Sequence, residues 1–140
     1  MKKLAFALLA FIFIFPLCAE KATLNTGDAF GFSLADYFFP NEKEAAWYSG
    51  QSSFPDMAGA FRDMGVKNVV IKTGPQGCYV SGEEGEFSLP ALPVSVVDMT
   101  GAGDSFVAGF ISGILKNASL KECAQMALLS ASKTITHIGT

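Results

Sequence analysis

Charge is scarce in this sequence. Only 16% of the 140 residues are charged, and the formal net charge is −3. No basic cluster is available to bind nucleic acid, and there is no long acidic tail, so we expect no nucleic-acid partner. Any phosphate group that the protein binds must be held by local contacts. Half of the residues are apolar, which is enough for one globular domain with a core.

Cysteine is also too sparse to build a scaffold. The three cysteines, Cys18, Cys78 and Cys123, are odd in number, widely spaced, and form no CxxC pair. This pattern argues against both a disulfide framework and a zinc site. We interpret Cys78 and Cys123 as small buried hydrophobic residues.

The first nineteen residues differ from the rest of the chain. Two lysines precede an uncharged stretch from Leu4 to Ala19, which is typical of a secretory signal peptide. The stretch is short for a membrane span, and it would act as an anchor only if it stayed uncleaved. The alternative is a strand or helix buried in a longer domain. Residues 20–34 are left as an unassigned linker.

From residue 35 onward, extended and helical patterns alternate, which predicts an α/β fold. The segment 68–72 is a continuous β-branched strand, the kind found in a sheet covered on both faces. Gly109 and Gly113 lie one turn apart on a later helix, where a neighbouring element could approach its backbone closely. Strands are expected at 35–39, 68–72, 78–81 and 94–98, with an exposed strand after a turn within 81–90, and helices at 41–50, 56–65 and after residues 103 and 119.

A glycine turn precedes the helix after residue 103. Gly101 and Gly103 let the backbone approach an anion, and the free N–H groups at a helix start favour negative charge. Asp104 would repel a phosphate held there, so its presence needs a reason. It could stabilise the first turn of the helix, or it could take the proton of a hydroxyl that receives a phosphoryl group. The spacing alone leaves both hypotheses open.

The turn belongs to a longer pattern that resembles a known family. The stretch DMTGAGDSFVAGF, residues 98–110, resembles the C-terminal signature of the ribokinase-like (PfkB) carbohydrate kinases, with Met99 in place of the commoner threonine. Segments 35–45, 69–80 and 131–140 resemble the family's strand with N-x-x-E, its G-x-x-G nucleotide loop and its late helix. Residues 35–140 thus resemble the C-terminal nucleotide-binding half. The resemblance implies a ribokinase-like three-layer sandwich with a mostly parallel sheet, here expected to be truncated.

The resemblance also implies roles for individual residues. Asp104 would be the catalytic base, and the backbone of Gly101, Ala102 and Gly103 would form an anion hole. Asp98 falls where some relatives hold a monovalent cation such as K⁺, although an aspartate at a strand end is commonplace.

Other residues would bind the nucleotide. Asn41 and Glu44 match N-x-x-E, which organises magnesium, water and nucleotide phosphates in the family, with Glu44 acting on the metal indirectly. The same pair is also a capping box. The residues expected along the nucleotide are Lys72, Gly74 and Gly77, with a plain hairpin as the alternative. His137, the only histidine, is expected to have a structural role or to lie at the nucleotide edge.

Three functions stay open. The first is an ATP-dependent and Mg²⁺-dependent carbohydrate kinase acting on a small sugar, of which this is a partial chain. The second is a non-catalytic nucleotide-binding fragment, and the third is a secreted α/β binding protein. Family function implies the cytoplasm and a homodimer, whereas a working signal in residues 1–19 would imply export.

Overall fold

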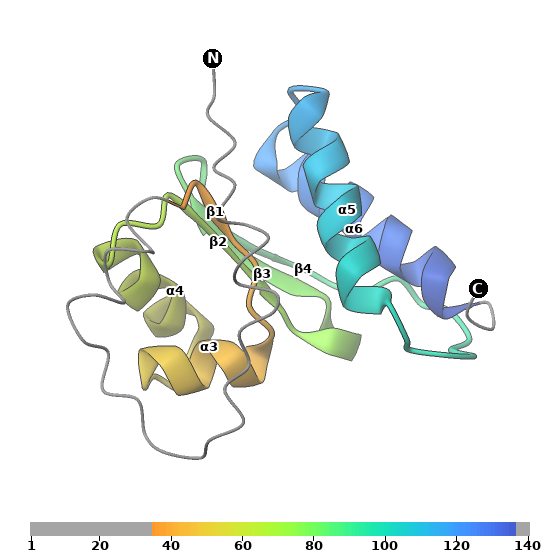
Figure 1. Ribbon diagram of the computed structural model, residues 1–140, viewed down its shortest axis with the longest axis horizontal. Coiled ribbons are helices and arrows are strands. Elements are labelled where there is room, and N and C mark those ends of the chain that lie inside the picture. Colours follow the sequence, from red (N-terminus) through yellow and green to blue (C-terminus); the bar gives the residue numbers. More distant parts are fainter. Residues whose placement is uncertain (1–34, 137–140) are drawn as a thin grey trace.

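The computed structural model describes residues 35–136, which form one sheet with helices on both faces (Figure 1). The expectations for residues 1–34 and for His137 lie outside this range. The strands are β1 (Tyr37–Phe38), β2 (Asn68–Lys72), β3 (Cys78–Gly82) and β4 (Gly85–Leu89), in the order β1-β2-β3-β4. The helices are α3 (Glu42–Ser49), α4 (Phe54–Asp63), α5 (Ala102–Leu115) and α6 (Leu120–Ile135), with a 3₁₀ turn, η1, at Gly74–Gln76.

The sheet is mixed rather than mostly parallel. β1 and β2 run parallel, and α3 and α4 connect them. β2 pairs antiparallel with β3, and β3 pairs antiparallel with β4. The expectation of a mostly parallel sheet is therefore wrong for the strands described. The connections at 73–77 and 83–84 are too short for the crossover that a parallel pair needs, so they can form only hairpins.

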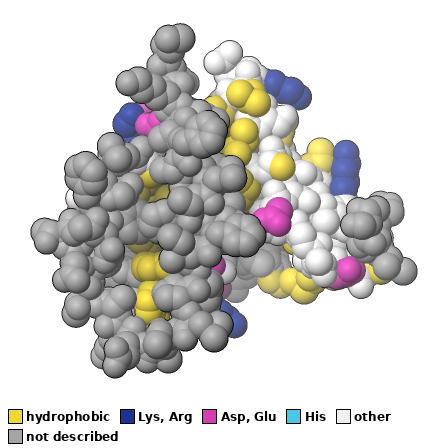
Figure 2. All heavy atoms as spheres, viewed as in Figure 1, with side chains coloured by type: hydrophobic (Ala, Val, Ile, Leu, Met, Phe, Trp, Pro, Cys, Tyr) yellow, Lys and Arg dark blue, Asp and Glu magenta, His cyan; other side chains and the backbone are white. Residues whose placement is uncertain are grey.

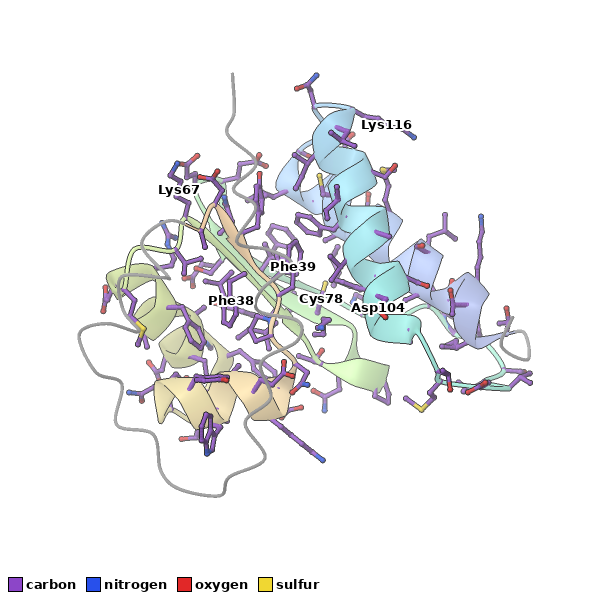
Figure 3. The ribbon with its side chains drawn as sticks, in the orientation of Figure 1. Phe38, Phe39, Lys67, Cys78, Asp104 and Lys116 are labelled. Atoms are coloured by element: carbon purple, nitrogen blue, oxygen red, sulfur yellow. The ribbon has the colours of Figure 1, made fainter. Side chains whose placement is uncertain are left out.

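Alternation along the strands produces the three layers. Phe38 turns its ring toward Phe61 of α4, with ring centroids 4.9 Å apart, whereas the next residue, Phe39, meets Phe110 of α5 at 5.1 Å (Figure 3). The α/β class and the three-layer arrangement are confirmed. The buried core between the sheet and α3 and α4 comprises Ala45, Met57, Ala58, Phe61, Val66, Val69, Ile71 and Tyr79. The core on the other face comprises Val70, Cys78, Val80, Phe106, Phe110, Leu120, Cys123, Ala124, Ala127 and Leu128.

Helices α5 and α6 approach each other closely because of two glycines. A Cβ on Gly109 would lie 2.7 Å from the carbonyl oxygen of Met126. A Cβ on Gly113 would lie 2.7 Å from Cys123 Sγ. Any larger residue would push the helices apart, so the predicted close approach is confirmed. Cys78 and Cys123 are free and buried, as the sequence indicated.

The stretch before α5 is not a strand. Residues 94–98 were expected to return to the sheet, but they are irregular, and Val96 and Val97 are 56% and 55% exposed. The N–H groups of Val97 and Asp98 both donate to the carbonyl of Ile135, at 2.7 and 3.2 Å, which ties the stretch to the end of α6. β-branched residues form a strand only beside a partner, and none of the strands within 35–136 pairs with this stretch.

On the face of the molecule that Figure 2 shows, apolar side chains are exposed over α5. Within residues 35–136, no helix is long and apolar enough to cross a bilayer.

Candidate functional site

The candidate site lies where β1 and β2 end. Asn41, at the start of α3, forms an isolated parallel bridge with Lys72, the last residue of β2. The backbone N–H of Lys72 donates to the carbonyl of Pro40 at 2.8 Å. The Lys72 side chain reaches the start of α5, where its Nζ lies 3.7 Å from the position that a Cβ on Gly103 would occupy. Three sequence-predicted segments therefore meet at one end of the sheet.

The glycine turn leaves backbone donors available. Gly101 is the N-cap of α5 in the left-handed region, with φ 76°, which a glycine adopts without strain. The N–H of Ala102 donates to the carbonyl of Met99 at 3.2 Å, so this member of the expected anion hole already has an acceptor. Within the described range, the N–H groups of Gly101, Gly103 and Asp104 have no acceptor. These three are the donors that could meet an anion.

Asp104 differs from the other acidic residues at the same helical position. Glu44, Asp56 and Glu122 are each the third residue of a helix, and each is hydrogen-bonded to its N-cap residue. Asp104 is the third residue of α5, it is exposed, and it forms no hydrogen bond or ion pair with the residues that the structure describes. Gly101 has no side chain to pair with it. The capping hypothesis therefore finds no capping bond in support.

Lys72 introduces a positive charge between two carboxylates. Its side chain is half-buried, and burial lowers the pKa of its ammonium group below the ordinary value, while the nearby carboxylates of Glu44 and Asp104 raise it. Its ammonium group forms no ion pair or hydrogen bond with any residue from 35 to 136. A partly desolvated charge without a direct partner is unusual in a folded protein.

The capping-box interpretation of Asn41 and Glu44 is confirmed. The Asn41 N–H donates to Glu44 Oε2 at 2.8 Å, and the Glu44 N–H donates to Asn41 Oδ1 at 2.9 Å. Glu44 Oε1 has no partner among the described residues, and magnesium typically takes one or two carboxylates together with water and phosphate. The Glu44 carboxylate is therefore suited to the role of an indirect magnesium ligand. Nowhere in residues 35–136, including around Glu44, is there a group of three or more His, Cys, Asp or Glu side chains that could hold a metal.

Gly74 and Gly77 belong to the β2–β3 hairpin. The Gly77 N–H donates to the carbonyl of Gly74 at 3.0 Å, and the Thr73 N–H donates to the carbonyl of Gly77 at 2.9 Å. Gly77 has φ 101°, and a Cβ there would collide with the Leu89 carbonyl oxygen. The structure therefore contains the hairpin, and contact of Gly74 and Gly77 with a nucleotide stays a prediction. Only Lys72, of the three residues expected along the nucleotide, reaches toward the glycine turn.

Asp98 lies in an irregular loop rather than at a strand end. Its Oδ1 accepts a hydrogen bond from the Thr100 N–H at 2.9 Å. Its own N–H donates to Ile135 at 3.2 Å, so the loop before the glycine turn is tied to α6. The side chain is half-buried.

Sequence reasoning missed two residues that support the turn. Thr134 of α6 lies 2.7 Å from Ser105, between side-chain oxygens. Thr134 Cγ2 is also 3.8 Å from the position of a Cβ on Gly101. No local pattern could have identified this pair, because it depends on how α6 lies against α5.

A helix start with free N–H groups, beside the strand ends of a layered α/β sheet, is an arrangement suited to binding an anion. The family model described as pfkB family carbohydrate kinase matches residues 3–140. The chain belongs to this family.

Comparison with individual relatives supports this family assignment. The chain is 37% identical over 109 residues to a cytidine kinase of Thermococcus kodakarensis, covering 76% of this chain and 39% of that protein. The structure of a Thermotoga maritima ribokinase matches with a TM-score of 0.75 and 29% identity, covering 79% of this chain and 39% of that one. An Escherichia coli protein described as ribokinase II, solved with ATP and Mg²⁺, matches with a TM-score of 0.73 and 30% identity. The match covers 79% of this chain and 36% of that one. The chain therefore spans less than half the length of these relatives.

Proposed function

We propose that this chain binds ATP and transfers its γ-phosphoryl group to a hydroxyl of a small sugar. In the step, the hydroxyl oxygen forms a bond to the γ-phosphorus while the bond to the oxygen bridging the β- and γ-phosphorus atoms breaks. ADP leaves with that electron pair, and the hydroxyl proton passes to the carboxylate of Asp104. Such a transfer asks the protein mainly for positioning, charge stabilisation and one base.

One observation carries this proposal. Asp104 stands in the first turn of α5 without a capping bond, beside backbone N–H groups that have no acceptor in the described part of the chain. A carboxylate there opposes anion binding and stabilises nothing by hydrogen bonding, so a role as base accounts for its presence.

The other residues take supporting roles in this proposal. The N–H groups of Gly101 and Gly103 receive the transferred phosphoryl group, and Asn41 and Glu44 face the nucleotide phosphates. Magnesium, held indirectly by Glu44, would offset negative charge on those phosphates. Asp98 would be near a monovalent cation, K⁺, where its loop meets the end of α6.

The acceptor is proposed from the relatives. A cytidine kinase and ribokinases are among them, which supports a hydroxyl of a ribose unit, free or within a nucleoside. We assign residues 35–140 to nucleotide binding and phosphoryl transfer, and we place the activity in the cytoplasm, where ATP is available. A homodimer and a membrane anchor stay predictions of the sequence.

The test combines binding and turnover on the purified chain. Calorimetry with ATP and Mg²⁺ should give a binding heat, and a coupled assay should detect ADP released in the presence of ribose or cytidine. A folded chain that gives no heat with millimolar nucleotide would overturn nucleotide binding. Binding without any phosphorylated product would leave the non-catalytic alternative.

A further inference from the structure

The stretch that leads into α5 carries a run of exposed apolar side chains. Between residues 92 and 99, the large apolar side chains that are 37% to 63% exposed are those of Leu92, Val94, Val96, Val97 and Met99. Single exposed apolar residues are common on a soluble protein, whereas several close together mark a surface that another molecule covers. The stretch is irregular, and it lies outside both buried cores.

One edge of this stretch has free backbone groups. The N–H of Val97 donates to the carbonyl of Ile135 at 2.7 Å, so that edge is held against the end of α6 (Figure 1). Along an extended backbone, N–H groups point alternately to opposite edges, so those of Val94 and Val96 would point away from α6. Neither N–H has an acceptor among the residues that the structure describes. Pro93, which has no N–H, falls on the α6 side and leaves the open edge uninterrupted.

Charge is absent from this part of the sequence. Residues 87–97 contain no Asp, Glu, Lys or Arg. Charged side chains on an edge are a common way in which proteins prevent strands of two molecules from pairing. The β-branched residues of the stretch also favour a strand as soon as a partner strand supplies hydrogen bonds. An uncharged apolar strand is therefore the partner that this edge fits, and the same stretch in a second copy of the chain is such a strand.

We propose that two copies of this chain associate through antiparallel pairing of residues 94–96. The two-fold axis passes beside Ser95, so that Val94 of each copy lies opposite Val96 of the other, and the free N–H groups find carbonyl acceptors. The other edge of the stretch is held by α6, so pairing stops at two copies. The strand expected near residues 94–98 then forms in the pair, although the single chain lacks it. This inference is independent of the proposed function.

The distribution of charge allows this pairing. Asp98 lies three residues from the axis, so at about 3.4 Å per residue the two Asp98 carboxylates are roughly 20 Å apart, which exceeds the screening length of about 10 Å. The interface is small, and small interfaces bind weakly, so we expect a dissociation constant on the order of 0.1 mM. In dilute solution the chain is therefore a monomer with this stretch exposed.

Analytical ultracentrifugation across a range of concentrations tests the pairing. The parent chain should change from monomer to dimer as its concentration rises toward the millimolar range. Val96→Lys places two ammonium groups beside the axis and should raise the dissociation constant at least about 10-fold. Leu115→Lys, at the far end of α5, is the matched control, because Leu115 is 72% exposed, and it should associate as the parent does. A parent that stays monomeric, or equal weakening in the two variants, would overturn the proposal.

A disulfide tests the register of the pair. Opposed residues that exchange no hydrogen bonds have Cα atoms about 4.5 Å apart, which is within the range of a disulfide. Ser95→Cys should therefore give a reducible dimer under mild oxidation, whereas Ser88→Cys, at an exposed position of β4, should not. Both are made in a Cys18→Ser background, since Cys78 and Cys123 are buried. A covalent dimer from both variants, or from neither, contradicts pairing at Ser95.

Amide hydrogen exchange distinguishes a second copy from other partners. The N–H groups of Val94 and Val96 should become protected as the concentration rises, in parallel with dimer formation. Protection at every concentration would mean that another part of the same chain covers the edge, and assemblies that grow beyond two copies would mean open-ended aggregation. Either result would overturn the proposal. None of these measurements uses nucleotide, so a failure to bind ATP refutes only the proposed function.

Discussion

Thr134 of α6 shares a hydrogen bond with Ser105 of α5, with 2.7 Å between their side-chain oxygens. Ser105 directly follows Asp104, and Thr134 also packs behind Gly101. The last part of α6 therefore supports the first turn of α5, which carries every backbone donor of the candidate anion site. This support for the site comes from a different helix.

Thr134→Val should loosen that turn. Valine keeps the shape of threonine but removes the hydroxyl, which should cost about 1 kcal/mol of stability and weaken ATP binding a few-fold. Chemical denaturation and calorimetry would measure both effects. Thr134→Ser keeps the hydroxyl and is the matched variant that should retain ATP affinity. Equal affinities in the two variants would show that the hydroxyl does not position the turn.

Asp104→Asn should reduce phosphoryl transfer by about two to four orders of magnitude, the usual contribution of a positioned general base. ATP affinity should stay constant or rise, because the carboxylate repels the phosphate. The melting temperature should not change, since Asp104 forms no capping bond. Steady-state assays and thermal melts report these quantities.

Glu122→Ala is the comparison for stability. Glu122 accepts the Ser119 N–H at 2.8 Å, so its removal should lower the melting temperature, whereas Asp104→Ala should not. If Asp104→Asn keeps most of its activity, the carboxylate is not the base.

Gly77→Ala should destabilise the fold far more than Gly74→Ala. Both glycines have positive φ, 101° and 57°, but only at Gly77 would a Cβ strike the backbone at Leu89, whereas Gly74 has open space. We expect a cost of about 1 kcal/mol at Gly74 and several-fold more at Gly77. Denaturant unfolding measures the difference. Similar losses at the two positions would mean that the β2–β3 loop and the end of β4 can move apart to admit the Cβ.

Cys78 should be unreactive at ordinary pH. Burial raises the pKa of its thiol to about 11 from 9.0, so the folded protein keeps a proton that the unfolded chain releases. The free energy of unfolding contributed by this group is therefore present below pH 9.0 and is lost as the pH rises toward 11. Alkylation followed by site-resolved mass spectrometry should detect little modification of Cys78 at pH 8. Rapid modification at pH 8 in native buffer would contradict the burial.

Val96→Thr should be nearly neutral, within about 0.5 kcal/mol, because Val96 is 56% exposed in an irregular stretch. Val70→Thr, the matched change in the centre of β2, places a hydroxyl in the core and should cost about 1–3 kcal/mol. Thermal or denaturant unfolding of the two variants would measure both losses of stability. A large loss at Val96 would indicate that residues 94–98 are buried against a partner after all.

Much of the fold could be predicted because its signals are local. The signals are the continuous β-branched run of β2, the capping boxes at Asn41 and Ser119, and the glycine that ends α3, and each acts within a few residues. The prediction of a strand at 94–98 was wrong because strand formation depends on more than local signals. β-branched residues prefer extended backbone, but a strand forms only when another strand supplies hydrogen bonds, and that partner is not encoded in the stretch itself.

The sequence by itself determined the order of the elements, the glycine turn and the acidic residue that follows it, since these depend on backbone freedom and short-range spacing. Only the tertiary structure decided that Lys72 meets Gly103, that Thr134 supports Ser105, and that Asp104 lacks a capping partner. Each of these relations joins residues on separate elements or depends on the shape of a turn. Long-range packing of the sheet and helices places them together, and no pattern within a single segment specifies that packing.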